Sequence, residues 1–417
     1  MKKVLVGAMA LLSLAACSNE EVLQKNEVNQ EIGFTAVTGK ALSRAADGYC
    51  NNEKPESFDV WARVDANSYF KQENYNDTDH DGVYTGPNGR FWPDESKTVQ
   101  FYAALNYGGA TGVTPAWNAA AAPSESPLTI DGYKVEATPG AQKDFIYAMR
   151  SAKKSDATDG KIGLNFRHAL SQIEFAAKNS NPNIYVEISG VRLMHVFDTG
   201  NFTFPTQNTT NAYTDHNEGK DDHTGAYSPI TISSQGTWSV ITTGSPAPKA
   251  SYEIATRNAD DTAEETKAVQ GNSTVVSLTV TDPTSKEFNT NTLYVMPYPY
   301  KEFPATLWDG TGKPTDATTA YLAIKCDIWN VAAGDGSVEK KVPLWSGITS
   351  DKWIAVKLPT TTNWEQGKRY VYTFTFTTTG TGGVDPDGKD VLTPITLAVS
   401  VDDFVEGEHI GGVEMTK

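Results

Sequence analysis

Apolar and polar residues alternate with a period of two along most of the chain beyond residue 30. In YVYTFTFT, residues 370–377, aromatic side chains occupy one face and threonines most of the other. Similar alternation occurs in the segments 58–64, 99–105, 275–281 and 395–401. Half-buried antiparallel strands have this pattern, so each segment is predicted to be a strand.

The segment NIYVEISGVRL, residues 183–193, shows the same alternation with one interruption. Ile184, Val186 and Ile188 share one parity, and the apolar positions then continue with the opposite parity at Val191. The change falls at Gly190, and an extra residue in a strand turns its side chains to the other face. The sequence therefore predicts a strand with a bulge at Gly190.

Turn-forming residues separate these strands, and no long amphipathic helix is predicted. The fold class is therefore all-β, built from antiparallel sandwiches. The polar segment 178–184 marks a candidate boundary between an N-terminal domain, residues 45–180, and a C-terminal domain, residues 181–417. Dense turn residues from about Asn208 to Asn272 predict a large, irregular, acidic excursion within the second domain.

The first residues have the pattern of a secretory signal. Lys2 and Lys3 precede an apolar run that is too short to span a bilayer. The run ends in Leu-Ala-Ala-Cys, which resembles a bacterial lipobox, a motif that is cut before its cysteine so that the thiol receives a lipid. Residues 1–16 are therefore predicted to be a lipoprotein signal peptide, with Cys17 as the membrane anchor. The Ser-Asn-Glu-Glu that follows resembles a surface-export signal of lipoproteins in Gram-negative anaerobes.

Composition narrows the classes of function. The formal net charge of −16 argues against nucleic acid as a partner, because phosphate binding requires clustered Lys and Arg. The hydrophobic fraction of 39% is enough to bury a core. Of the three cysteines, Cys326 lies on the apolar side of its segment and is interpreted as a buried hydrophobe, so a disulfide scaffold is not expected.

The sharpest local pattern for a metal is DTDHDG, residues 77–82. Asp77, Asp79 and Asp81, followed by Gly82, resemble the start of a calcium loop, since carboxylates at this spacing can surround a hard cation. The twelfth position is Asn88, where such a loop has a glutamate, and no flanking helices are predicted, so the alternative is an Asp/Gly-rich turn between strands. No other cofactor is expected.

The histidines, the tryptophans and the absence of catalytic motifs indicate structural roles instead of catalysis. The sequence contains no nucleophile elbow, no HExxH, no phosphate loop and no CxxC pair, so no catalytic residues and no enzymatic activity are expected. His168 shares a strand face with Leu164 and Phe166, and is interpreted as a hydrogen-bonded structural histidine. Six tryptophans are candidates for either a glycan platform or ordinary packing: Trp92, Trp117, Trp308, Trp345, Trp353 and Trp364.

An ordered set of segments resembles the fimbrillin family, the lipoprotein pilins of Gram-negative gut and oral anaerobes. The segments are EIGFTAVTG, FDVWARV, RFWPDESKTVQFYAAL, QKDFIYA with an aspartate near its start, LNFRHALSQIEF, LYVMPYPY and GKRYVYTFTF. They occur in the order of the family and extend over most of the chain from about Cys17.

The resemblance implies two transthyretin-like antiparallel β-sandwich domains in tandem. It also implies a structural subunit of a cell-surface fimbria, delivered to the outer membrane as a lipoprotein and assembled with other fimbrial subunits by strand exchange. In that process an Arg-specific protease removes the N-terminal segment with its first strand, and a strand of another subunit fills the groove.

The residues that match this scheme lie at the two ends of the chain. The candidate cleavage site is between Arg44 and Ala45, so residues 17–44 would be a removable tether and first strand; alternatively, Arg44 is an exposed arginine in a linker. The exchanged strand would present Ile32, Phe34 and Ala36. The segment 394–404 is either a donor strand or the last strand of its own domain, and its apolar face carries Ile395, Leu397, Val399 and Val401.

Two other functions compete with the fimbrial subunit. A surface-anchored glycan-binding lipoprotein would also be β-rich and would bind a polysaccharide as a monomer, without any need for Arg44. A hydrolase would need a carboxylate pair that only folding brings together. The receptor and the position within a fimbria do not follow from the sequence.

Overall fold

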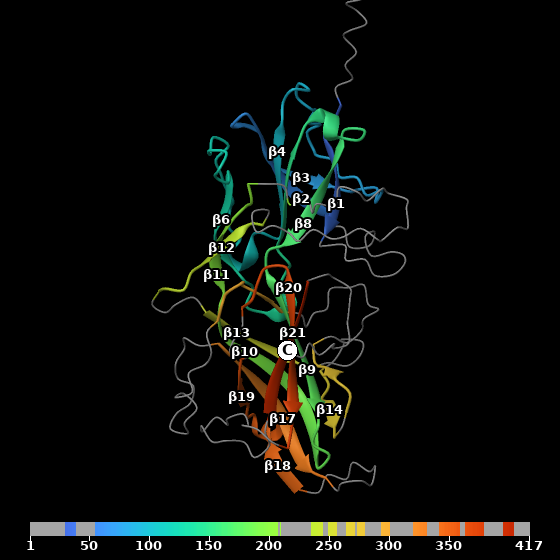
Figure 1. Cartoon of the computed structure of the whole chain (residues 1–417), viewed down its shortest axis with the longest axis vertical. Helices are drawn as coiled ribbons and strands as arrows, with labels where there is room; N and C mark the ends of the chain where they lie inside the picture. Colours follow the sequence, from blue (N-terminus) through green and yellow to red (C-terminus); the bar gives the residue numbers. More distant parts are fainter. Residues whose placement is uncertain are drawn as a thin grey trace, which may run out of the picture.

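The computed structural model describes residues 30–38, 55–206, 209, 235–244, 249–256, 264–271, 273–279, 293–300, 320–331, 342–358, 363–378 and 395–403. Figure 1 shows an elongated molecule with two lobes along its long axis. The described helices are the short turns η1 (Gly109–Thr111), η2 (Pro139–Ala141), η3 (Lys154–Asp156) and α3 (Gly347–Ser350). None of the helices in these ranges is long and apolar enough to cross a membrane.

The upper lobe contains a six-stranded sheet in the order β1-β8-β7-β4-β2-β3. Its strands are β1 (Gly33–Thr38), β2 (Ser57–Val64), β3 (Asn67–Asn76), β4 (Val99–Leu105), β7 (Ile146–Ala152) and β8 (Lys161–His168). Strands β1 and β8 pair in parallel, and the other neighbours pair antiparallel. Bridges from β1 to the segment after β3, Phe34 to Tyr84 and Glu31 to Phe91, curl the sheet towards closure.

A smaller sheet, in the order β12-β11-β6-β5, covers one face of this lobe. Its strands are β5 (Ala116–Trp117), β6 (Leu128–Lys134), β11 (Thr199–Thr203) and β12 (Thr237–Val240). Ile130 and Phe202 from this sheet share a buried cluster with Trp61, Tyr102 and Tyr147 of the six-stranded sheet. The two sheets therefore pack face to face.

The lower lobe is a sandwich of two sheets (Figure 1). One contains β9 (Ser171–Asn179), β15 (Val276–Ser277), β16 (Leu293–Val295), β20 (Lys368–Phe376) and β21 (Ile395–Asp403). The other contains β10 (Ile184–Phe197), β13 (Lys249–Ala255), β14 (Lys267–Gln270), β17 (Tyr321–Asn330), β18 (Val342–Ser346) and β19 (Ile354–Lys357). Strands β9 and β20 pair in parallel, with eight residue pairs from Arg369↔Gln172 to Phe376↔Asn179.

Two buried clusters form most of the core. One fills the inside of the curled six-stranded sheet and includes Phe34, Phe58 and Phe101. The other is continuous from Trp61 in the upper lobe to Phe374 in the lower lobe. An apolar core that is shared between lobes couples them, because separating them would expose buried side chains to water.

The structure confirms the all-β class, and four of the five strands predicted from simple alternation match β2, β4, β20 and β21 closely. In the fifth, 275–281, the described part (residues 275–279) contains the short strand β15, Val276–Ser277. The bulge at Gly190 is confirmed by a register shift between Ile188 and Gly190 in the pairing of β10 with β17. Cys326 is fully buried, as its apolar surroundings indicated.

The prediction of an irregular excursion from Asn208 to Asn272 was wrong for part of this region, because β12, β13 and β14 lie within it. Short strands with few apolar residues give a weak periodic signal, which the turn residues around them outweighed. The sheets also cross the division expected at residue 180. Strand β9 pairs with β20, and β11 and β12 join the sheet of β6.

Candidate functional site

Strand β1 and the residues just before it bury the apolar side chains that the family resemblance assigned to the exchanged strand. Ile32, Phe34 and Ala36 are 1%, 0% and 1% exposed, whereas Thr35 between them faces solvent. The ring of Phe34 meets three aromatic rings edge-on, those of Phe58, Tyr75 and Phe101, with centroids 6.2, 4.8 and 5.2 Å away. Full burial of one such side chain stabilises the fold by about 1.5–3 kcal/mol.

Backbone hydrogen bonds hold β1 on both sides. Its six residues pair with Lys161–Phe166 of β8 in an unbroken parallel register. On the other side, Phe34 and Tyr84 exchange N–H···O bonds of 3.1 and 2.8 Å. The N–H of Trp92 donates to the carbonyl of Gln30 at 2.9 Å. Strand β1 is therefore the end strand of the six-stranded order, with an isolated bridge to Tyr84 on its second edge.

Gly160 fixes the start of β1 from the neighbouring turn. Its φ of +83° lies in the left-handed region that favours glycine. Its carbonyl accepts hydrogen bonds from the N–H of Gly33 at 3.2 Å and from Nε1 of Trp92 at 2.8 Å. A Cβ atom at Gly160 would lie 2.3 Å from the carbonyl oxygen of Glu31, so the close approach of β1 requires glycine.

This arrangement makes β1 a self-contained unit. Ile32, Phe34 and Ala36 enter the core, and the backbone of β1 pairs with β8. Extended chains with alternating side chains bind sheets in this mode. Without β1, the edge of β8 and the rings around Phe34 would be uncovered, and such an edge is a template for another strand. The predicted lipidation site Cys17 and the predicted cleavage site Arg44–Ala45 lie outside the described residues.

The C-terminal candidate strand forms β21, which pairs with β20 over nine consecutive residues from Ile395↔Phe376 to Asp403↔Lys368. Ile395 is 3% exposed and Leu397 packs against the core, but Val399 and Val401 are 38% and 45% exposed. Half of its apolar face is therefore uncovered by the described residues. Its use as a donor strand stays a prediction.

The acidic loop after β3 brings its three carboxylates together. Asp77, Asp79 and Asp81 each offer an oxygen within 4.8 Å of the others, and the last two are exposed. Both oxygens of Asp77 accept backbone hydrogen bonds of 3.0 Å, from the N–H of Asp81 and of Gly82. The φ of Gly82 is +85°, in agreement with the tight turn expected there. Calcium binding at this loop stays a prediction.

His168 is buried and structural in its contacts. Its Nδ1 lies 2.5 Å from Oδ2 of Asp144, and the side chains are 3% and 5% exposed. Sequence reasoning singled out His168 and the segment around Asp144 separately but did not pair them. Their separation of 24 residues leaves no local signal, and only the sheet pairing of Ile146 with His168 brings them together.

The tryptophans do not form one platform in the described ranges, and Trp308 lies outside them. Trp92 and Trp364 are buried and donate through Nε1, the latter to the hydroxyl of Tyr372 at 2.8 Å. Trp353 lies on the outer face of the β10–β17 sheet under the guanidinium of Arg192, 3.9 Å from the ring centroid. Trp117 and Trp345 are half-buried.

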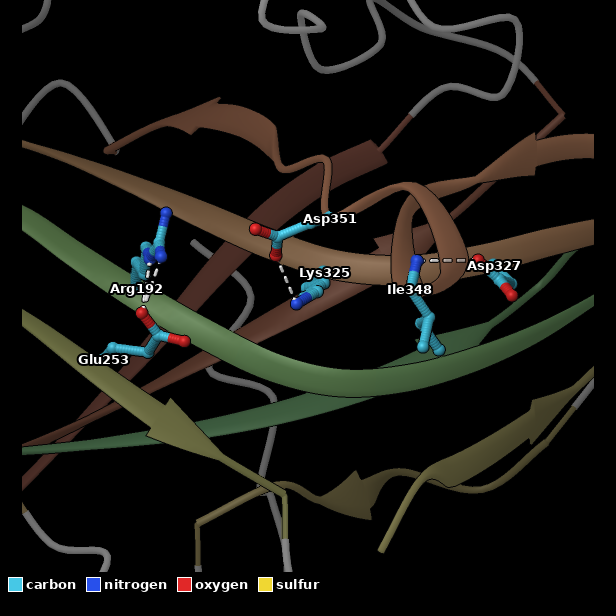
Figure 2. A network of polar contacts seen from close by, with 6 residues as sticks. All are labelled: Arg192, Glu253, Lys325, Asp327, Ile348 and Asp351. Atoms are coloured by element: carbon cyan, nitrogen blue, oxygen red, sulfur yellow. Dashed lines mark hydrogen bonds and ion pairs between the residues drawn. The ribbon is translucent and has the colours of Figure 1, made fainter. Parts of the chain in front are cut away.

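Figure 2 shows a network of polar contacts that includes Arg192. Arg192 pairs with Glu253 at 2.6 Å, and Lys325 pairs with Asp351 at 2.5 Å. Because Arg192 is already stacked on the ring, this face of Trp353 is occupied by a cation. Glycan binding by this chain stays a prediction.

Comparison with known proteins identifies the family of this chain. A sequence profile described as fimbrillin-like matches residues 29–293, which include β1 and the whole upper lobe. The chain therefore belongs to the fimbrillin-like family, as the ordered segments indicated. No curated protein matches the chain.

Solved structures that are similar to this chain include proteins from Bacteroides species. A fimbrial protein from Bacteroides vulgatus is 16% identical, with a TM-score of 0.55 over 90% of this chain and 100% of that one. A candidate cell adhesion protein from Bacteroides ovatus is 13% identical, with a TM-score of 0.41 over 90% of this chain and 98% of that one. Membership of this family supports a structural role as a fimbrial subunit at the cell surface.

Proposed function

We propose that this chain is a fimbrial subunit that is exported as a lipoprotein on Cys17 and assembled by exchange of strand β1. The observation that carries the proposal is how β1 is bound. Its apolar side chains are buried, and its backbone pairs with β8 and with Tyr84. Arg44 follows six residues after Thr38, so a cut there would separate β1 from the chain that follows. Cleavage after Arg44 by an Arg-specific protease leaves β1 attached to the body by noncovalent contacts alone.

An incoming strand can form the contacts that β1 gives up when it leaves. It pairs with the edge of β8 and inserts apolar side chains where Ile32, Phe34 and Ala36 stood. Filling the groove with a strand of another subunit restores the buried area, so exchange costs little free energy once β1 has left. The two lobes then correspond to the tandem transthyretin-like sandwiches that the family resemblance implies.

The decisive experiment is mass spectrometry of the N-terminus of the surface-assembled protein, for the natural chain and for Arg44→Ala. We expect a new N-terminus at Ala45 and loss of polymer in Arg44→Ala. Lys40→Ala is the matched control, because it removes a basic residue from the same segment without touching an arginine. An intact, lipidated Cys17 in the polymer would reject the cleavage mechanism.

For strand β21 we propose two roles that an experiment can separate. As a donor, it leaves β20 and fills the groove of the next subunit; as a resident strand, it keeps the subunit at the tip or anchor of the fimbria. Its unbroken nine-residue ladder with β20 favours the resident role. A disulfide between cysteines introduced at Tyr372 and Val399, which are paired residues, would block polymer formation only if β21 is the donor.

A further inference from the structure

Strands β8 and β9 form one line of backbone through both lobes. Strand β8 ends at His168 and β9 starts at Ser171, and the two residues between them, Ala169 and Leu170, are fully buried. In Figure 1 β8 lies in the upper lobe and β9 continues into the lower one. A force that separates the lobes along the long axis therefore acts on this line.

The upper lobe holds β8 unequally on its two edges. Strand β7 pairs with β8 at only two positions, Ile146↔His168 and Tyr147↔Arg167. Beyond them, Thr209 lies between the two strands and donates from its N–H to the carbonyl of Met149 at 2.9 Å. Strand β1 pairs with β8 at six positions, so it supplies the longer of the two ladders.

We propose that β1 and β8 form a load-bearing clamp, which resists a pull between the chain upstream of β1 and the lower lobe. Because the two strands are parallel, such a pull draws β1 backwards along its own direction while β8 is drawn forwards. The strands then slide past each other, and the six pairs are loaded together. A pull on the other end of β1 would instead break the pairs one after another.

Side chains and the second edge of β1 oppose the same sliding. A displacement by one residue would turn Phe34 out of its aromatic surroundings and Thr35 into them, since successive side chains face opposite sides. The bonds between Phe34 and Tyr84 and between Gln30 and Trp92 are sheared in the same movement. The clamp is therefore loaded on both edges and through its core.

The clamp goes beyond the proposed function and is a property of this chain alone. It concerns the chain with β1 in place, before any cleavage. A mechanical test on purified monomer needs neither protease nor assembly. Its failure and a failure of strand exchange are therefore distinguishable.

Single-molecule force spectroscopy tests the clamp with two pairs of thiol handles. One variant carries Asn29→Cys and Asn183→Cys, which loads β1 from its upstream end against the turn after β9. The other carries Lys40→Cys and Asn183→Cys, which peels β1 from its downstream end. Cys17 and Cys50 are replaced by serine in both.

We expect a rupture force about two- to threefold higher in the Asn29 variant, because forced unfolding depends on the barrier along the direction of pulling. Equal forces, or a higher force in the Lys40 variant, would overturn the clamp. Both variants keep the same core, so the difference in rupture force does not arise from a destabilised protein. Adding Phe34→Ala should lower the force of the Asn29 variant, whereas adding Thr35→Ala should leave it unchanged.

Discussion

The ring of Phe34 on β1 meets the ring of Tyr75 on β3 edge-on, with centroids 4.8 Å apart and an interplanar angle of 75°. These strands are the two ends of the six-stranded order, so their contact means that the sheet has curled until its edges share one core. Strand β1 closes the curl. The first predictions therefore concern the residues that keep β1 in place.

Replacing Phe34 with alanine should destabilise the protein strongly. The ring is fully buried, and its loss leaves a cavity among aromatic side chains that cannot collapse freely. We expect the free energy of unfolding to fall by about 3–5 kcal/mol, measured by urea denaturation. Thr35→Ala, at the exposed neighbouring position, should change it by less than about 0.5 kcal/mol. A similar small loss for both variants would contradict the docking of β1 described above.

Gly160→Ala should loosen the start of β1. Its Cβ would lie 2.3 Å from the carbonyl oxygen of Glu31, and its φ is +83°. Gly112→Ala is the matched control, since its φ is +63° but nothing lies within 4 Å of the added atom. Both variants incur the left-handed cost of about 1–2 kcal/mol, and only Gly160→Ala adds a clash.

Hydrogen exchange measures this difference at the site. In Gly160→Ala the amides of Gly33 and Phe34 should exchange faster, while Gly112→Ala should leave their protection close to that of the natural chain. If the two variants exchange alike, the approach of Gly160 to Glu31 has no role in seating β1.

Ala66→Gly should stabilise the β2–β3 hairpin. Asp65 and Ala66 form a two-residue turn between the paired residues Val64 and Asn67, with φ values of +50° and +62°. Glycine adopts this conformation without the steric cost that alanine incurs. We expect a gain of about 1 kcal/mol in unfolding free energy, visible as a higher midpoint in urea.

The control for this substitution is Ala157→Gly, where the φ is −89° and alanine is unstrained. There glycine should lower the stability by about 0.5–1 kcal/mol, because it has more freedom in the unfolded chain. Opposite signs for the two changes would identify the backbone conformation as the cause. A loss at both positions would reject strain at Ala66.

Alkaline pH should destabilise the fold through its buried tyrosines. Burial, with a contribution from Asp77, raises the pKa of Tyr84 from 10.0 to about 12. Burial likewise raises the pKa of Tyr370 to about 12. The folded state keeps these phenols neutral where the unfolded state ionises them, so their stabilising effect is complete below pH 10 and is lost as the pH rises through 12.

Tyrosinate absorbance and tryptophan fluorescence, recorded together between pH 9 and 12, check this expectation. Ionisation of these residues should accompany unfolding instead of preceding it. Tyr84→Phe should make the loss of stability with pH less steep. Full ionisation at pH 10 in a chain that stays folded would contradict the burial of these hydroxyls.

Much of the fold was predictable where the signal is local. Alternation over residues 99–105 gave the bounds of β4, and the parity change gave the bulge at Gly190, because both depend on side chains a few positions apart. The parallel pairing of β1 with β8 was not predictable. Gly33 and Lys161 are distant in the chain, and nothing in either segment specifies the other as its partner.

The same difference between local and long-range information applies to the candidate site. The choice of Ile32, Phe34 and Ala36 followed from the resemblance of their segment to a first strand, and all three are buried in the structure. Alternation placed Val399 and Val401 on an apolar face, but it could not indicate that this face is left exposed at the sheet edge. Alternation gives the side of a strand on which a residue lies, and the cover over that side depends on other strands.

The apolar cluster that extends from Trp61 to Phe374 has a consequence for how the molecule comes apart. The curled sheet of the upper lobe has a cluster of its own, but each half of the chain also contributes side chains to the common one. The protein should therefore melt as a single cooperative unit with one calorimetric transition, and an isolated half should not be a stable particle. The two lobes should therefore behave as one thermodynamic unit.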